Sequence, residues 1–120
     1  MRDFQNLDAW SKAHHLALAV YRLTEAFPSS ETFGMTMSLR RGSSHVAMKI
    51  AEACGRDDGE PYAAGLRHAR GLGVELEYQF LLARDLHLMD EVQHDSLRDQ
   101  IVEVRRMLSG VIKRHSQGLV

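Results

Sequence analysis

The sequence has one cysteine, two prolines and almost equal numbers of positive and negative charges. The low cysteine count and the balance of charge each exclude a class of protein. Its 120 residues include one cysteine, which excludes a framework of disulfides within the chain. Fifteen Lys and Arg stand against sixteen Asp and Glu, so the formal charge is -1. A disordered polyelectrolyte or a strongly basic nucleic-acid binder would be far from this balance, and any positive surface must therefore be local.

Segments that direct a chain into or across a membrane are also missing. The longest apolar runs, such as residues 16–21, are far shorter than the ~20 residues that span a bilayer. The first ten residues have neither the basic start nor the apolar run of a secretory signal. We therefore expect a cytoplasmic protein that does not enter membranes. The length fits a single domain over residues 1–120 with a real hydrophobic core.

Helical periodicity fills the segments between the few prolines and glycines. Apolar or small residues recur at alternating steps of three and four, which is the spacing of one face of a helix. The spaced positions are Trp10, Ala13, Ala17, Val20, Thr24 and Phe27, then Leu39, Ser43, Val46, Ile50 and Ala53, then Tyr62, Leu66, Ala69, Gly73, Leu76, Phe80, Ala83 and His87, and finally Leu97, Ile101, Val104, Leu108, Val111 and His115. They predict helices over roughly 8–27, 32–54, 61–88 and 91–116. An all-α, antiparallel up-down-up-down four-helix bundle is the simplest packing.

The third predicted helix carries more apolar surface than one bundle requires. The additional residues that we assign to an oligomer interface are Leu72, Val74, Tyr78, Leu81 and Leu82. A wide core-facing stripe is the alternative, but the amount of apolar surface favours a subunit interface and hence a homo-oligomer. Gly71 and Gly73 in this helix indicate close approach of another helix or a local bend, since glycine is otherwise unfavourable there.

Charged residues beside the apolar positions predict two further features. The first is a network of ion pairs that fixes helix register, in which Arg40 or Arg41 meets Glu75 or Glu77, with Glu52 nearby; ordinary solvated helix faces are the alternative. The second is a basic rim, repeated by symmetry around an oligomer. Its residues are Lys49, with Arg40 and Arg41, on the second helix, and Arg105, Arg106, Lys113 and Arg114 on the fourth. The basic end of the fourth helix also suits the helix dipole, which is the alternative explanation.

Residue types that carry catalysis are present, but their spacing is not that of a known site. Seven histidines include no pair at the three- or four-residue step that brings two rings to one helix face. Glu91 and His94 form the single Glu-x-x-His, whereas a di-iron bundle needs two. Cys54 follows an apolar stretch typical of a packed, unreactive thiol. We expect no metal and no cofactor.

The same residues carry a resemblance to a known family. It rests on Phe33-Gly34, on Leu39-Arg40-Arg41, on Ile50-Ala51-Glu52 with Arg56, and on Glu75-Leu76-Glu77-Tyr78-Gln79. In this order they resemble the 23S ribosomal RNA intervening-sequence proteins, a family of four-helix bundles that includes the accessory variability determinant of diversity-generating retroelements. The resemblance implies a ring, as a pentamer, and its retroelement branch implies contact with a reverse transcriptase and nucleic acid. It implies no established general activity.

Two functions follow as expectations. The first is a non-enzymatic oligomeric scaffold that binds RNA, DNA or a nucleic-acid-processing protein partner. The alternative is an enzyme, metal-dependent or acting on a small ligand, that uses His and Glu side chains in the bundle or in a ring channel. Its candidate residues are Glu75, Glu77, His68 and His87 on the third helix.

Overall fold

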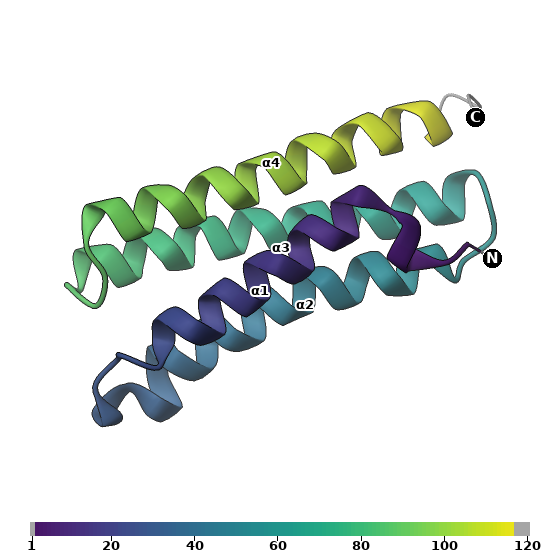
Figure 1. The fold of residues 1–120 in the computed structure, drawn as a ribbon. Coiled ribbons are helices and arrows are strands. Elements are labelled where there is room, and N and C mark those ends of the chain that lie inside the picture. The colour runs from purple at the N-terminus through teal and green to yellow at the C-terminus, as the bar shows by residue number, and fades with distance from the viewer. Residues whose placement is uncertain (1, 117–120) are drawn as a thin grey trace.

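The computed structural model describes residues 2–116, which fold into four α-helices joined by short turns (Figure 1). The helices are α1 (Asp8–Thr24), α2 (Met37–Cys54), α3 (Glu60–Asp85) and α4 (Glu91–Ser116), and the turns include η1 (Phe4–Asn6), η2 (Ser29–Glu31) and η3 (Thr32–Thr36). Successive helices run antiparallel and α1 also packs on α4, so α2 and α4 are diagonal. The predicted all-α four-helix fold is confirmed. Of the predicted domain over 1–120, residues 1 and 117–120 lie outside the described part.

The helix ends differ from the predicted ones at three places. α1 stops at Thr24 instead of residue 27, and the N–H of Phe27 donates to the Thr24 carbonyl in a tighter turn. At the start of the predicted helix over 32–54 the backbone departs from helical geometry at Gly34 (φ -104°, ψ -114°), within η3, and regular α-helix starts at Met37. α3 ends at Asp85 instead of residue 88 because His87 takes a left-handed backbone with φ 62°.

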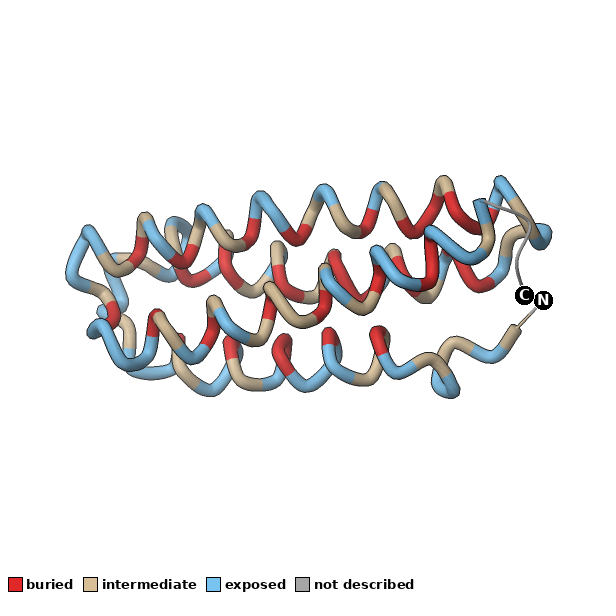
Figure 2. The backbone as a smooth tube through the Cα atoms, turned by 90° about the horizontal axis from the view of Figure 1, so that it is seen from above, coloured by how far each residue is buried: buried red, intermediate tan, exposed pale blue. Residues whose placement is uncertain are grey.

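The core lies along the axis of the bundle, where the inward sides of the four helices are buried (Figure 2). All five predicted positions of α2 and seven of the eight of α3 are buried; the eighth, His87, lies beyond the end of α3. Tyr62 and Phe80 are the largest fully buried side chains. Burying each such apolar side chain stabilises the fold by roughly 1.5–3 kcal/mol.

Small residues on α3 set how closely its neighbours approach. A Cβ at Gly65 would lie 2.7 Å from the Ala53 Cβ, so α2 and α3 meet here with almost no side chain between them. A Cβ at Gly73 would lie 3.0 Å from the Cγ of Arg105 on α4. The predicted close approach is thus confirmed for Gly73, whereas a Cβ at Gly71 would meet nothing within 4 Å.

Backbone conformation sets the start of α3, and polar side chains set the start of α4. Gly59 precedes α3 with φ 83°, a backbone that glycine adopts freely, and Pro61 occupies the first turn. At α4, Asp90 accepts from the Gln93 N–H at 2.8 Å and the Gln93 side chain accepts from the Asp90 N–H at 2.9 Å. Within residues 2–116, no helix combines the length and the apolar character needed to cross a membrane.

Candidate functional site

An apolar stripe lies on the outward side of α3, beside α4. Val74, Tyr78 and Leu81 recur at steps of four and three and have exposed fractions of 52%, 61% and 36%. They line a groove of about 470 Å³ between α3 and α4, which we call the α3–α4 groove. Its polar lining consists of Glu77, Arg84, His94, Arg98 and Arg105. The groove therefore offers an apolar floor with a charged border.

The arginines of the α3–α4 groove are already paired with carboxylates. Arg105 donates to the Glu77 carboxylate from the facing helix, and its side chain passes over Gly73. Arg84 lies 3.5 Å from the Glu91 carboxylate, and Arg98 lies 3.1 Å from that of Asp99. Because each positive charge has a negative partner, the groove can be covered by an apolar surface without isolating a charge.

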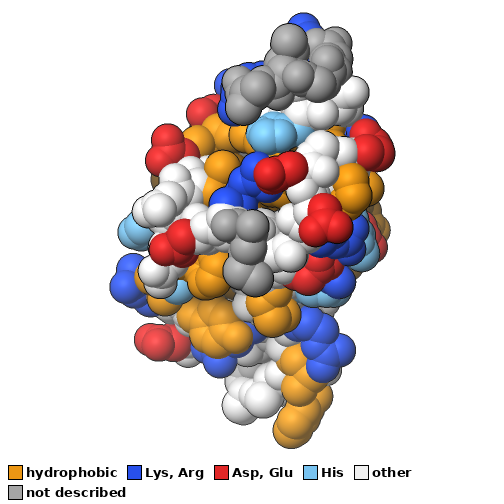
Figure 3. Space-filling model, turned by 90° about the vertical axis from the view of Figure 1, so that its right-hand side faces the viewer, with side chains coloured by type: hydrophobic (Ala, Val, Ile, Leu, Met, Phe, Trp, Pro, Cys, Tyr) orange, Lys and Arg blue, Asp and Glu red, His pale blue; other side chains and the backbone are white. Residues whose placement is uncertain are grey.

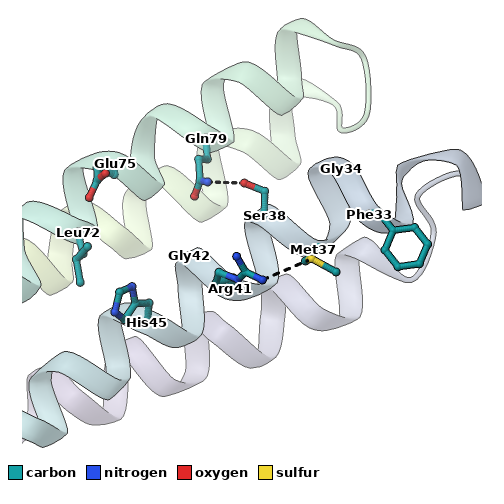
Figure 4. Close-up of a pocket in the computed structure, with 10 residues that line it drawn as sticks. All are labelled: Phe33, Gly34, Met37, Ser38, Arg41, Gly42, His45, Leu72, Glu75 and Gln79. Carbon is teal, nitrogen blue, oxygen red and sulfur yellow. Dashed lines mark hydrogen bonds between the residues drawn. The ribbon is translucent and has the colours of Figure 1, made fainter.

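A second groove, the α2–α3 groove, lies on the other side of α3 (Figure 4). Its volume is about 310 Å³, and Phe33 stands at its end on η3, next to the kink at Gly34. The Gln79 amide of α3 donates to the Ser38 hydroxyl of α2 at 2.6 Å. A Cβ at position 42 would lie 2.4 Å from the Gln79 Oε1, so Gly42 leaves the space that this amide occupies.

Cationic side chains along α2 border this second groove. Arg41 and His45 line it, and Lys49 continues the same four-residue spacing. Within residues 2–116, no carboxylate lies within 4.0 Å of Arg41 or Lys49. Arg41 instead donates to the Met37 sulfur at 3.7 Å, a weak contact. We call Arg41 and Lys49, with the His45 ring between them, the α2 cationic stripe.

Comparison with known proteins places the chain in a family. The model of the 23S rRNA-intervening sequence protein family matches residues 5–110. The chain belongs to this family. The resemblance seen in the sequence is thereby confirmed, and the matched range includes both grooves and the α2 cationic stripe.

A solved structure supports the fold of this family member. The crystal structure of a protein of unknown function from the S23 ribosomal protein family of Bacteroides thetaiotaomicron VPI-5482 superposes with a TM-score of 0.77. It is 19% identical in sequence, and the match covers 88% of this chain and 98% of the other. At this identity the likeness concerns the fold alone. No curated protein matches the chain.

The ion pairs of this family member differ from those predicted. Arg40 does not meet Glu75 or Glu77; it turns to α1 and donates to the Thr24 hydroxyl at 2.8 Å. Its second contact, at 3.2 Å, is to the Tyr21 carbonyl near the end of α1, which also accepts from the Thr24 hydroxyl at 3.1 Å. The other carboxylates of the predicted network also take other partners: Glu77 pairs with Arg105 and Glu52 with Arg56. Nor does Arg41 pair with Glu75, although both line the α2–α3 groove.

Two of the predicted interface residues are placed apart from the rest. Leu72 is partly buried and packs against the core on the α2 side, which agrees with the alternative of a wide core-facing stripe for this position. Leu82 is also partly buried. Val74, Tyr78 and Leu81 alone form the exposed stripe.

The predicted basic rim is not gathered into one cluster in the single chain. Lys49 lies on α2, diagonal to the four basic residues of α4. Arg105 is bound to Glu77, and Arg106 lies 3.5 Å from the Glu103 carboxylate. Lys113 and Arg114 are exposed near the end of α4. Over the visible part of that end of the bundle, Asp and Glu side chains are interspersed with Lys and Arg (Figure 3).

The candidates for catalysis lie apart. Glu75 lines the α2–α3 groove, whereas Glu77 lies in the α3–α4 groove, and His87 is the left-handed residue that ends α3. His68 is exposed on α3. His94 is buried, and its Nδ1 lies 3.0 Å from the Asp95 carboxylate. Within residues 2–116, no three His, Cys, Asp or Glu side chains are grouped so that they would hold a metal ion.

The lone thiol has the environment of a structural residue. Cys54 is 1% exposed at the end of α2. Burial raises the pKa of its thiol above the ordinary value of 9.0, because the thiolate would be poorly solvated there. A thiol held neutral in this way is a poor nucleophile, as the sequence predicted.

Sequence reasoning missed the exposed aromatic ring of Phe33. Its side chain is 85% exposed, more than any other large hydrophobic residue described. The periodic pattern assigned this region to the start of a regular helix, in which Phe33 has no place in the buried series. An aromatic residue outside that series and followed directly by glycine was the available signal.

Proposed function

We propose that this chain is a non-enzymatic, homo-oligomeric helical scaffold that acts by binding. One observation carries the proposal: the stripe of Val74, Tyr78 and Leu81 is exposed on a rigid helix whose core-facing side is already filled. Contiguous apolar surface of this kind is typical of a protein interface. The family resemblance seen in the sequence supports a ring of five copies.

The absence of enzymatic activity is part of this proposal. Its support is geometric, because Glu75 and Glu77 lie in different grooves and His87 caps a helix. The alternative is a metal-dependent or small-ligand enzyme that uses these side chains with His68. X-ray fluorescence of protein purified without added metal tests the metal-dependent form, and a stoichiometric transition metal would contradict our proposal.

Light scattering during size exclusion tests the scaffold directly. The wild-type chain is expected to elute with the mass of several copies, and Tyr78→Glu with the mass of one, because a charge at the centre of the stripe would be buried unpaired. Val92→Glu is the matched control, since Val92 is 79% exposed on α4 and does not line the groove. A wild-type chain that remains monomeric over the whole accessible concentration range would contradict the proposal.

Nucleic acid is the partner that we propose for the scaffold. The support is the α2 cationic stripe, whose Arg41 and Lys49 have no carboxylate within 4.0 Å among residues 2–116. Phosphate is a fitting partner for such side chains, and symmetry would repeat the stripe on every copy, so the charge of -1 per chain is no obstacle. A protein partner with an acidic surface is the other occupant of the same stripe.

The salt dependence of binding separates nucleic acid from no binding. We expect the affinity for single-stranded RNA to fall with salt, with a log-log slope of about -0.7 per phosphate contact, and for duplex DNA about -0.9. Lys49→Gln should make the slope shallower by about one contact in every copy that touches the strand. Arg56→Gln is the control, because Arg56 is already bound to Glu52. A flat salt response would exclude this partner.

A further inference from the structure

The turn that carries Phe33 presents its ring to solvent, and hydrogen bonds hold the backbone of this turn. The Glu31 carboxylate accepts from the Met35 N–H at 3.2 Å, and the Thr32 hydroxyl donates to the Ser29 carbonyl at 2.8 Å. Both bonds hold the backbone on either side of Phe33. One turn further along, Met37 is also 39% exposed. Phe33 and Met37 together form an exposed apolar projection, the Phe33 turn, at the end of the α2–α3 groove (Figure 4).

The Phe33 turn lies at the same level along the bundle as the α3–α4 groove. The hydrogen bond between Ser38 and Gln79 fixes the register of the antiparallel pair α2 and α3. Phe33 precedes Ser38, on the far side of the kink at Gly34, and Arg84 follows Gln79 on α3, so both lie toward the same end of the bundle. Met37 comes one residue before Ser38, so it lies at about the level of Tyr78 and Leu81 on the antiparallel α3. A projection and a groove therefore lie at one level, on two different sides of α3.

From this juxtaposition we infer that the Phe33 turn of one copy docks into the α3–α4 groove of a second copy. A rotation about an axis parallel to the bundle keeps each residue at its level, so it can bring this projection against this groove in a neighbouring copy. Two different surfaces then meet, which makes the contact heterologous and allows it to repeat around a closed ring. The inference rests on the proposed homo-oligomer and names both halves of its interface.

The chemistry of the two surfaces agrees with this contact. Val74, Tyr78 and Leu81 offer an aromatic and aliphatic floor for the Phe33 ring. Arg84 and Arg98 line the same groove, and a guanidinium is attracted to the face of an aromatic ring. Both arginines keep their carboxylate partners, Glu91 and Asp99, so the contact leaves no lone charge covered.

A mixing experiment tests the heterologous contact. Phe33→Glu and Tyr78→Glu are each expected to have the mass of one chain by light scattering, because each loses one half of the interface. Mixed in equal amounts, they should give a species of twice that mass and nothing larger. The groove of the Phe33→Glu copy accepts the intact turn of the Tyr78→Glu copy, and no further contact is available. Phe33→Ser and Tyr78→Ser repeat the test without an added charge.

The outcomes are distinct from those that test the scaffold itself. If the wild-type chain is monomeric, the scaffold fails and the inference fails with it. If the wild-type chain is oligomeric and Phe33→Glu keeps the full oligomer mass, only the inference is overturned. If both variants are monomeric but their mixture stays so, the contact is not between these two surfaces. Met48→Glu is the matched control: Met48 is 58% exposed on α2 and lines neither groove, so the full mass should be kept.

Discussion

Two apolar stripes run along the last half of α3; one is buried and the other is exposed. Leu76, Phe80 and Ala83 face the core and are at most 1% exposed. Val74, Tyr78 and Leu81 have comparable apolar character and similar spacing, yet they are 36–61% exposed. The inner stripe is buried because α1, α2 and α4 carry matching stripes that close one core. Among residues 2–116 the outer stripe has no counterpart, which is why we assign it to a contact between copies.

Replacing one residue in each stripe should have the largest and the most unequal effect. Phe80→Ala is expected to lower the free energy of unfolding by about 3–5 kcal/mol, since it leaves a cavity in the core. Tyr78→Ala should change it by less than about 0.5 kcal/mol in a monomeric chain. Urea unfolding in the Phe33→Glu background, which we expect to be monomeric, measures both. Equal losses would mean that the outer stripe belongs to the fold.

Two glycines of α3 extend the comparison to the backbone. Gly65→Ala places a Cβ 2.7 Å from the Ala53 Cβ and 3.1 Å from its Cα, so α2 and α3 must move apart, at a cost of about 1–3 kcal/mol. Gly71→Ala meets nothing within 4 Å and should stabilise the helix by about 0.5–1 kcal/mol. Thermal unfolding of the two variants should therefore shift in opposite directions. A shift in one direction for both would contradict the close approach at Gly65.

The inner stripe could be predicted from the sequence, but the polar contacts could not. Helical periodicity identified the buried positions of α2 and α3 because burial of a helix face depends on spacing alone. The partner of an arginine depends on its rotamer and on which helix is adjacent. Arg40 lies near enough to α1 to reach the Thr24 hydroxyl, so it never meets the carboxylates of α3. The break in the helical backbone at Gly34 also escapes periodicity, because it separates Phe33 from the regular series of α2, which starts at Met37.

His87, just beyond the end of α3, is a position where a substitution should stabilise the fold. His87 has φ 62°, a backbone region that costs a residue with a side chain roughly 1–2 kcal/mol and glycine almost nothing. His87→Gly should therefore raise the free energy of unfolding by about 0.5–1 kcal/mol, and His87→Ala should not. Chemical unfolding of the three proteins measures the difference. A loss of stability in His87→Gly would show that the imidazole has a role beyond ending the helix.

The smallest expected effect concerns the ion pair between Glu52 and Arg56 at the end of α2, in contrast to the α2 cationic stripe. The Arg56 guanidinium donates two hydrogen bonds to Glu52, at 2.7 Å each, and this bonding holds the pKa of that carboxyl below its ordinary 4.5. A lowered pKa in the folded chain gives stability that is present above pH 4.5 and is lost as pH falls through the folded value. Because the pair is exposed at one turn's spacing and is screened by solvent, Arg56→Gln should lower the stability only slightly near neutral pH. That difference should vanish at acid pH, where Glu52 is protonated in both proteins. Arg41 has no carboxylate within 4.0 Å among residues 2–116, so Arg41→Gln should follow the wild-type acid profile. A changed profile would mean that Arg41 pairs with a carboxylate in solution.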